Sequence, residues 1–449
     1  MPAFGETLEQ ALVAAYTTNP TLLAERAKLR ATDEQVPQAL ANWRPTVTVT
    51  GDVGRSDVTA RELLYVQNTV LSASSTLINS SEQMAVNISQ PLYRGGRTVA
   101  QTRQAEATVE AERALLRSTE QTVLLNVITA YMNVVETKAL LELAINNEQV
   151  LQRQLDAVLD RFHVGEVTRT DVAQAESRLS AAHADRTQAE GNLRSAVANY
   201  VNTVGHAPDQ TVTPAVLPAL PDNIDQAQDQ AAAENPNILN ARFSYEAAEN
   251  GVDLIAGELL PTVSLNGTAY KYFNYAGPDT LEEAMQATIN ISVPIYQQGQ
   301  EYSRLRAQKE TAGQMRTTVD VTRRDTREAV TRAWEALQTA RARMVSYADQ
   351  IRAAKVALEG VQRESQVGSR TVLDVLNAEQ ELLNAQVNQV ESQHDEIVAT
   401  FQLLSAVGRL NARSLALPVE SYDPMEHYGQ VREKWIGVGE SLPDAEQGK

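Results

Sequence analysis

The chain has 449 residues, enough for two or three ordinary domains or for one very elongated domain. Its net charge of −18 argues against a nucleic-acid-binding surface, and its lack of cysteine excludes disulfides, thiol catalysis and cysteine-based metal sites. Aromatic residues make up only 5% of the chain, which indicates helices packed through Ala, Leu and Val rather than a large globular core.

The N-terminal stretch 1–6 has neither the basic residues nor the apolar run of a signal peptide. Two interpretations stay open: a cytosolic protein, or a protein whose signal peptide has been removed and whose Met1 is not native. No run of about 18 apolar residues occurs anywhere, so we expect no transmembrane helix.

An internal repeat organises the chain. Pairs spaced by 216 residues are Asn19-Pro20 with Asn235-Pro236, and Pro45-Thr46-Val47 with Pro261-Thr262-Val263. Pairs spaced by 203 residues are Asn87-Ile88-Ser89 with Asn290-Ile291-Ser292, Val164-Gly165 with Val367-Gly368, and Asp171-Val172 with Asp374-Val375. The first copy therefore carries 13 extra residues between Gly51 and Asn87, and we expect them to form a surface loop.

Each repeat is predicted to contain a helix, two strands and a long helical hairpin. The first repeat, 6–224, has a helix over 6–42, strands over about 44–54 and 84–94, a hairpin over 97–204 and a proline-rich linker. The second repeat, 225–413, has a helix over 226–258, strands over about 260–272 and 285–297, and a hairpin over 300–407. No structure is assigned to the C-terminal tail, 414–449.

The predicted strands alternate apolar and polar residues with a period of two. The apolar positions are Val47, Val49, Val86, Ile88, Val263, Leu265, Ile289, Ile291 and Val293. Each stretch has about ten residues, the length at which a tilted strand crosses a bilayer, although a sheet that caps a helical body is an alternative. Four strands cannot close a barrel, whereas three chains would supply twelve, so the arithmetic favours a membrane barrel.

The helical hairpins carry a heptad pattern, seen between Leu141 and Phe162, that predicts packing of two helices along their length. About 64 residues in the long helix correspond to a rod of about 95 Å. Gly165 and Gly368 suit the left-handed backbone position that follows a helix. Asp171 and Asp374 follow these turns, and their plainest role is to stabilise the start of the next helix.

No enzyme motif is present. The sequence lacks a phosphate-binding GxxxxGK loop, an HExxH motif and a GxSxG motif, and its five histidines are scattered. We therefore predict no catalytic residues, no metal site and no cofactor. A soluble coiled-coil scaffold protein is an alternative to a membrane channel, because it would explain the heptads and the acidity, but it leaves the alternating strands unexplained.

Residues 6–412 resemble the TolC family of outer-membrane efflux proteins. The resemblance rests on the duplication, on RPTVTVTG at the start of the first strand, on the strand ends ISQPLYRGG and ISVPIYQQG, and on the turns RFHVGEVTRTDV and VGSRTVLDVL. It implies a mainly α fold with a small β part, assembled as a homotrimer. A 12-stranded β-barrel would be continuous with a long α-helical barrel. The location implied is the outer membrane of a Gram-negative bacterium, spanning into the periplasm, with the signal peptide removed.

The resemblance also implies a gate at the periplasmic tip. Arg370 matches the arginine that pairs with an aspartate of the first turn, here Asp171, to hold the tip closed. Asp374 matches the aspartate ring of the constriction. The second aspartate of the family is replaced by Asn377, and a tyrosine that takes part in closing is replaced by Ser365, which predicts fewer charges and fewer closing contacts here.

The partners implied by the resemblance are two further copies of the chain, outer-membrane lipid, a periplasmic adaptor (membrane fusion) protein and an inner-membrane pump. Val164, Gly165, Val367 and Gly368 match the tips that contact the adaptor. The function implied is the passive exit duct of a tripartite efflux pump or type I secretion system, opened at its tip by the adaptor. The lack of cysteine makes the chain look closer to the unlipidated secretion-type members.

Overall fold

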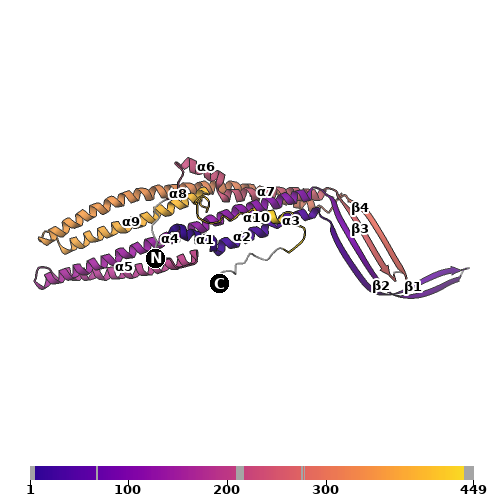
Figure 1. The fold of residues 1–449 in the computed structure, drawn as a ribbon, viewed down its shortest axis with the longest axis horizontal. Helices are drawn as coiled ribbons and strands as arrows, with labels where there is room; N and C mark the ends of the chain where they lie inside the picture. The colour runs from indigo at the N-terminus through magenta and orange to yellow at the C-terminus, as the bar shows by residue number, and fades with distance from the viewer. Residues whose placement is uncertain (1–5, 67–68, 209–216, 275–276, 278, 439–449) are drawn as a thin grey trace. The chain divides into compact units, whose positions relative to one another are not determined.

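The computed structural model describes residues 6–66, 69–208, 217–274, 277 and 279–438. The same order of elements occurs twice along the chain (Figure 1). The first copy contains α1 (Leu8–Thr18), α2 (Pro20–Asp33), α3 (Gln35–Leu40), β1 (Thr46–Val66), β2 (Thr69–Arg94), α4 (Arg97–His163) and α5 (Arg169–Val204). The second copy contains α6 (Ile224–Glu234), α7 (Pro236–Ala256), β3 (Thr262–Phe273), β4 (Leu281–Ser292), α8 (Gln300–Gln366) and α9 (Val372–Val407). The predicted duplication and fold class are therefore confirmed, and a short helix α10 (Glu426–Val431) lies in the tail.

The chain forms two compact units, and each unit contains parts of both repeats. The helical unit consists of Met1–Arg30, Glu110–Arg242 and Thr317–Pro424, and the strand unit consists of Ala31–Val109, Phe243–Arg316 and Met425–Lys449. The repeats are thus interleaved and do not fold as separate domains. The repeat bounds 6–224 and 225–413 stay predictions.

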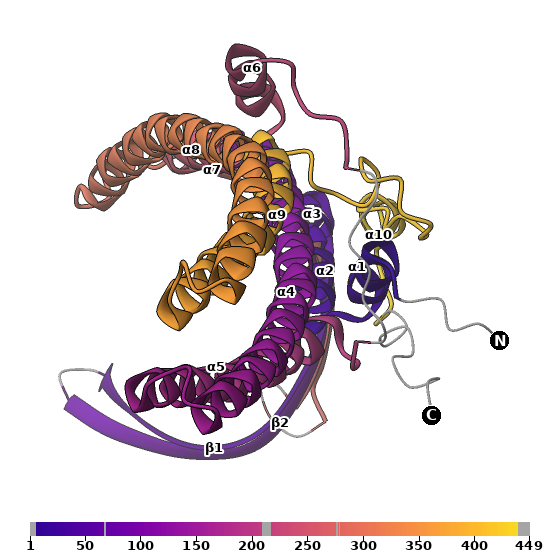
Figure 2. The ribbon, with the colours of Figure 1, turned by 90° about the vertical axis from the view of Figure 1, so that its left-hand side faces the viewer.

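The helical unit consists mainly of two antiparallel hairpins, α4 with α5 and α8 with α9 (Figure 2). The duplication also governs the packing, because α1 contacts α5 just as α6 contacts α9. Its largest apolar core contains the fully buried side chains of Leu124, Ile128, Tyr131 and Tyr200 together with residues of α1 and α9. These contacts hold the short helix α1 against the long helices α4, α5 and α9.

The single helices expected over 6–42 and 226–258 are each broken, which corrects the prediction. Asn19 and Asn235 both leave the helix at φ −64° and ψ 122°, because a residue that precedes proline disfavours the helical conformation. The proline then begins the next helix, where its missing N–H costs nothing. The side-chain amide of Asn19 donates to the carbonyl of Thr203 at 3.0 Å, and that of Asn235 donates to Ala406 at 2.9 Å. Each break is thereby anchored to the end of α5 or α9.

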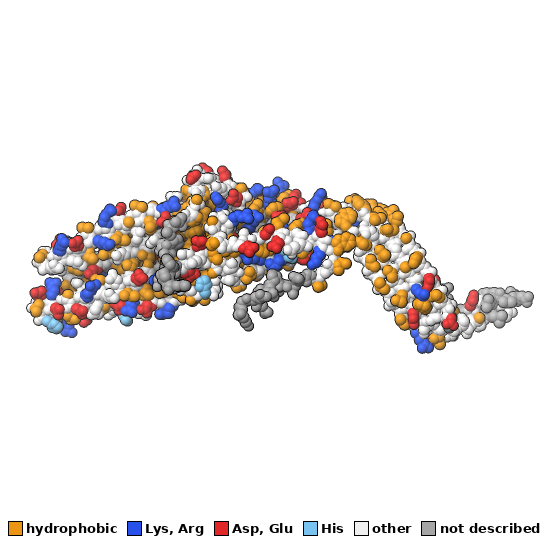
Figure 3. All heavy atoms as spheres, viewed as in Figure 1, with side chains coloured by type: hydrophobic (Ala, Val, Ile, Leu, Met, Phe, Trp, Pro, Cys, Tyr) orange, Lys and Arg blue, Asp and Glu red, His pale blue; other side chains and the backbone are white. Residues whose placement is uncertain are grey.

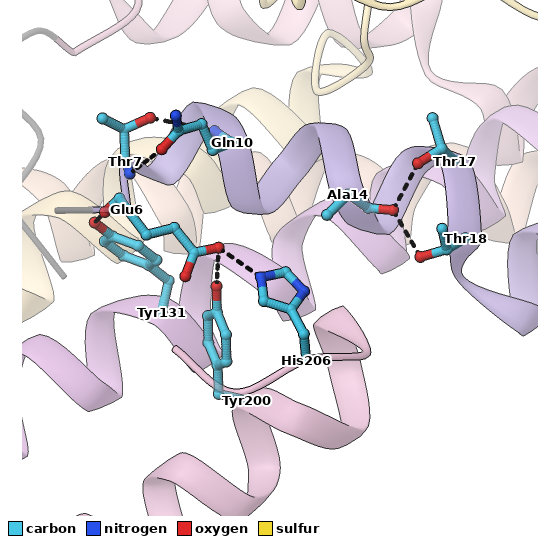
Figure 4. A network of polar contacts seen from close by, with 9 residues as sticks. All are labelled: Glu6, Thr7, Gln10, Ala14, Thr17, Thr18, Tyr131, Tyr200 and His206. Atoms are coloured by element: carbon cyan, nitrogen blue, oxygen red, sulfur yellow. Dashed lines mark hydrogen bonds and ion pairs between the residues drawn. The ribbon is translucent and has the colours of Figure 1, made fainter. Parts of the chain in front are cut away.

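Glu6 anchors the start of α1 to the two helices of the first hairpin (Figure 4). Its backbone carbonyl accepts a hydrogen bond from the hydroxyl of Tyr131 at 2.7 Å. Its Oε1 accepts one from the hydroxyl of Tyr200 at 2.8 Å and lies 2.9 Å from Nε2 of His206. Burial and the neighbouring Glu6 carboxylate raise the pKa of Tyr200, so this hydroxyl stays a donor at any physiological pH.

The strand unit contains one antiparallel sheet with the strand order β1-β2-β3-β4. β1 and β2 are longer than predicted, with 21 and 26 residues, because the register of the hairpin continues from Thr46 opposite Ser89 to Val66 opposite Thr69. The 13 extra residues of the first repeat therefore lengthen a hairpin and do not form the expected surface loop. Polar and β-branched side chains dominate this stretch, and they favour extended pairing.

β4 ends at Ser292, five residues before its predicted end at 297. Pro294 follows closely, and a proline cannot donate to the ladder of a strand. In the part of the chain that the structure describes, none of the helices carries an apolar stretch of the length that a membrane-spanning helix requires.

Candidate functional site

Apolar side chains cover one face of the four-stranded sheet (Figure 3). The register places Val47 beside Ile88, Val49 beside Val86 and Leu265 beside Ile289, so that these side chains share one face. Of the positions predicted to face lipid, those exposed are Val47, Val49, Val86, Ile88, Leu265, Ile289, Ile291 and Val293. Val263 is half-buried, and Val293 lies just beyond the end of β4. An exposed apolar face of this extent marks a surface that contacts another apolar phase.

The opposite face of the sheet is polar and internally hydrogen-bonded. The hydroxyl of Ser89 donates to the side chain of Asn266 at 2.8 Å, and the hydroxyl of Thr268 donates to Asn87 at 3.1 Å. The two faces therefore differ as the faces of a transmembrane barrel strand do, with one suited to lipid and the other to a lumen.

The two hairpin turns of the helical unit have the same geometry. Gly165 at φ 79° and Gly368 at φ 78° take the left-handed conformation, as the sequence predicted. The N–H of Glu166 donates to the carbonyl of Arg161, and the N–H of Ser369 donates to that of Glu364, both at 2.9 Å. These are the bonds of a Schellman motif, which satisfies the last carbonyls of α4 and α8.

Each turn presents an apolar side chain to solvent. Val164 is 71% exposed and Val367 is 77% exposed, and each immediately precedes the glycine of its turn. Both side chains therefore lie outside the core of their own hairpin and are accessible to a second protein.

Asp171 and Asp374 begin their helices in the same way. The carboxylate of Asp374 accepts hydrogen bonds from the backbone N–H of Thr371 at 2.9 Å and from its hydroxyl at 2.8 Å, and Asp171 accepts the equivalent pair from Thr168 at 2.8 Å each. Both form capping boxes, so the role in helix initiation is confirmed for both. The bonds from Thr371, together with the charge of Arg370, hold the pKa of Asp374 below its usual value.

Arg370 pairs with a residue of its own hairpin. Its Nε donates to Oε2 of Glu364 at 2.9 Å, across the turn from α8. Within this single chain, the described residues contain no ion pair between Arg370 and Asp171. The pairing of Arg370 with Asp171 stays a prediction about the assembled protein.

Asn377 connects the two hairpins. Its side-chain oxygen accepts a hydrogen bond from Nη2 of Arg178, on α5, at 3.1 Å. Val372 and Leu376 of α9 lie on the same stretch and pack into an apolar cluster with residues of α4 and α5. Ser365 is buried beneath its turn, where its carbonyl accepts from the N–H of Gly368 at 3.2 Å. Asn377 thus offers Arg178 a neutral acceptor.

The sequence did not single out Glu379, a carboxylate that lies five residues beyond Asp374 on α9. It is only 8% exposed, and its Oε2 has no hydrogen-bond partner among the described residues. Burial raises its pKa, while a hydrogen bond from Gln362 and the charge of Arg153 act in the opposite direction. Its equivalent in the first repeat, Glu176, is exposed. The 203-residue spacing of the repeat relates Glu176 to Glu379. Nothing in the surrounding sequence indicates that Glu379 is the buried member of this pair.

The described residues contain no group of three or more His, Asp or Glu side chains placed to hold a metal ion. The candidate site is therefore a set of surfaces: an apolar sheet face, a polar sheet face, and two tips that carry charges and exposed valines.

Comparison with known proteins identifies the family of the chain. Residues 11–206 and 227–409 match the family described as "Outer membrane efflux protein". The outer membrane efflux protein BepC of Brucella suis is 36% identical over 437 residues, which cover 97% of this chain and 92% of the relative. The outer membrane protein TolC of Vibrio cholerae is 25% identical, over 92% of this chain and 93% of the relative.

Solved structures agree on the fold. The CmeC outer membrane channel of Campylobacter jejuni superposes with a TM-score of 0.78 at 16% identity, over 95% of this chain and 89% of that chain. The architecture therefore persists at an identity that is too low to carry an argument about individual residues.

Glu379 should make the stability of the tip depend on pH. Burial raises the pKa of Glu379 in the folded state. The stability that the protonated side chain contributes is therefore fully present below pH 4.5, the ordinary pKa of glutamate, and is lost as the pH rises through the raised pKa of the folded state. Glu379→Gln should therefore stabilise the protein at pH 7, by about 1 kcal/mol, because the neutral amide removes the buried charge, and by much less near pH 4.5, where the carboxyl of Glu379 is largely protonated. Thermal unfolding between pH 4.5 and 8 measures this. Glu176→Gln is the matched control and should change nothing; an equal effect in both variants would contradict the assignment.

The bond from Arg178 to Asn377 should restrain the start of α9. Arg178→Gln should speed amide hydrogen exchange over residues 372–385 about two- to tenfold, as expected for a bond worth about 0.5–1.5 kcal/mol. Asn377→Asp should slow it, because the bond then joins two charges. Arg169→Gln removes an exposed arginine near the same tip and serves as the control. Unchanged exchange in Arg178→Gln would show that the bond does not hold the hairpins together.

Proposed function

Since this chain belongs to the outer membrane efflux protein family and is an outer-membrane efflux or secretion channel, we propose that it works as a trimeric exit duct opened at its periplasmic tip. Because the members of this family are transport proteins, the chain is neither an enzyme nor a soluble coiled-coil scaffold. The observation that carries the proposal is the sheet, which has an exposed apolar face, a hydrogen-bonded polar face and outer strands β1 and β4.

Three copies complete the membrane part. A lipid-exposed strand edge leaves backbone groups without partners, at a cost of several kcal/mol for each group. Pairing β4 of one copy with β1 of the next would satisfy both edges and give a closed barrel of twelve strands, with the apolar face toward outer-membrane lipid. The polar face, with Asn87, Asn266 and Thr268, would then line the lumen.

The hairpin tips form the gate. Three copies of Asp374 around one axis would make a ring of three negative charges, which focuses a negative potential in a narrow pore and favours cations. Arg370 of one copy would pair with Asp171 of a neighbour to close the tip, in competition with its bond to Glu364. Ser365 supplies no additional side-chain contact across the pore, so few interactions hold the closed state.

An adaptor protein opens the gate by binding the open form more tightly than the closed form. The exposed valines Val164 and Val367, beside Gly165 and Gly368, offer this adaptor two equivalent apolar contacts on each copy. The duct itself uses no energy, and an inner-membrane pump drives the cargo through it.

Single-channel conductance in a planar lipid bilayer tests the gate. Asp374→Asn should reduce cation selectivity and block by divalent cations, because it removes the ring of charge. Asp171→Asn makes the same chemical change in the equivalent capping box. Because it removes the proposed partner of Arg370, it should raise the conductance of the closed channel but alter selectivity far less. For the wild type, selectivity should persist down to a pH below 3.8, the ordinary value, because the pKa of Asp374 is lowered. Equal effects in the two variants would overturn the placement of the ring, and a protein that forms no channel would overturn the function.

A further inference from the structure

A cavity of about 450 Å³ lies within the helical unit, and its lining includes no residue of the two hairpin turns. Its walls come from four segments: the α1–α2 region, α4, the α6–α7 junction and the chain that follows α9. This volume falls in the range of sites for small organic molecules. Its floor is apolar, because Tyr16, Leu22 and Leu116 belong to one buried cluster that Tyr422 packs against.

The lining of the cavity is basic in a chain that is strongly acidic. Arg26, Arg113, Arg117 and Arg413 line it, against only two carboxylates, Glu120 and Glu234. The whole chain has a net charge of −18, so this accumulation of arginine is a local departure from the composition. Guanidinium groups bind carboxylate and phosphate through paired hydrogen bonds.

Arg26 is held in place by two aromatic rings of the cavity. Its guanidinium carbon lies 4.6 Å from the ring centre of Tyr16 and 5.1 Å from that of Tyr422. Its Nη2 donates to the backbone carbonyl of Tyr16 at 3.3 Å, and the N–H of Tyr422 donates to the hydroxyl of Tyr16 at 3.1 Å. The aromatic wall and its cation are therefore preorganised before any ligand arrives.

The guanidinium groups of Arg117 and Arg413 are available to bind an anion. Among the residues that the structure describes, neither Arg117 nor Arg413 forms an ion pair with a carboxylate, and both are exposed at the cavity. Arg113, in contrast, pairs with Glu110 at 2.5 Å.

The two carboxylates of the cavity are already engaged. Oε1 of Glu120 accepts the backbone N–H of Ala412 at 2.8 Å, and Glu234 lies 4.0 Å from Arg409, which is outside the lining. Burial raises the pKa of Glu120, while the charges of Arg26 and Arg117 act in the opposite direction. Glu120 is thus the carboxylate that competes with a bound anion for Arg117.

We propose that this cavity binds a small organic anion, whose carboxylate or phosphate group is held by Arg117 and Arg413 and whose apolar body lies against Tyr16 and Tyr422. Such a ligand would join α4 to the segment that follows α9, and so would stabilise the helical unit. The site is independent of the gate, and binding can be measured whether or not the channel opens.

Isothermal titration of the full-length detergent-purified protein tests the site. The probes are phenyl phosphate, phenylacetate and inorganic phosphate. Phenyl phosphate should bind with a dissociation constant below about 1 mM, and at least about tenfold more tightly than inorganic phosphate, because only the former uses the aromatic wall. A comparison with phenylacetate then identifies which anionic group the site prefers.

Variants locate the binding. The double variant Arg117→Gln, Arg413→Gln should weaken phenyl phosphate binding at least about tenfold, and Glu120→Gln should tighten it. The control is Arg324→Gln, Arg343→Gln, which removes two exposed arginines of α8 outside the cavity and should bind as the wild type does. No binding of any probe, or an equal loss in the control variant, would overturn the proposal.

Discussion

The sheet imposes the constraint on which the rest of the structure depends. A four-stranded sheet that exposes valine, leucine and isoleucine on one face, and that has two outer strands, is not stable alone in water. It needs an apolar phase for the face and a neighbouring strand for each edge. In the assembly that we propose, lipid and two further copies would satisfy both needs at once, and the duplication supplies two similar strand pairs per chain.

If the tips form the gate as we propose, one set of residues there serves both folding and function. The capping box formed by Thr371 and Asp374 starts α9, and the same hydrogen bonds keep the carboxylate ionised. A charge fixed in this way has a defined position, as the proposed ring of Asp374 requires. Glu379 lies five residues further along α9, and its pKa is shifted in the opposite direction. Burial penalises its charged form more than the hydrogen bond from Gln362 and the charge of Arg153 stabilise it. The surroundings therefore shift the pKa values of two carboxylates of one helix in opposite directions.

Much of the architecture could be predicted from the sequence, because periodicity and turn residues are local signals. The hairpin glycines, the alternating strands and the duplication were all visible in the residues themselves. The helix breaks at Asn19 and Asn235 were signalled by the prolines that follow, but the lengthened hairpin of β1 and β2 was not, since its polar residues also suit a loop. The contact of Arg178 with Asn377, the burial of Glu379 and the arginine-lined cavity depend on tertiary packing between distant segments. No local pattern encodes such contacts.

The central claim is that the sheet is completed by two further copies of the chain. Native mass spectrometry of the full-length protein, released from detergent micelles, tests it most directly. The account predicts a single species with three times the chain mass of 49.1 kDa, and no folded monomer in the absence of detergent. A monomer that stays folded and soluble in plain buffer would show that the apolar face and the open strand edges need no partner, and would contradict the account.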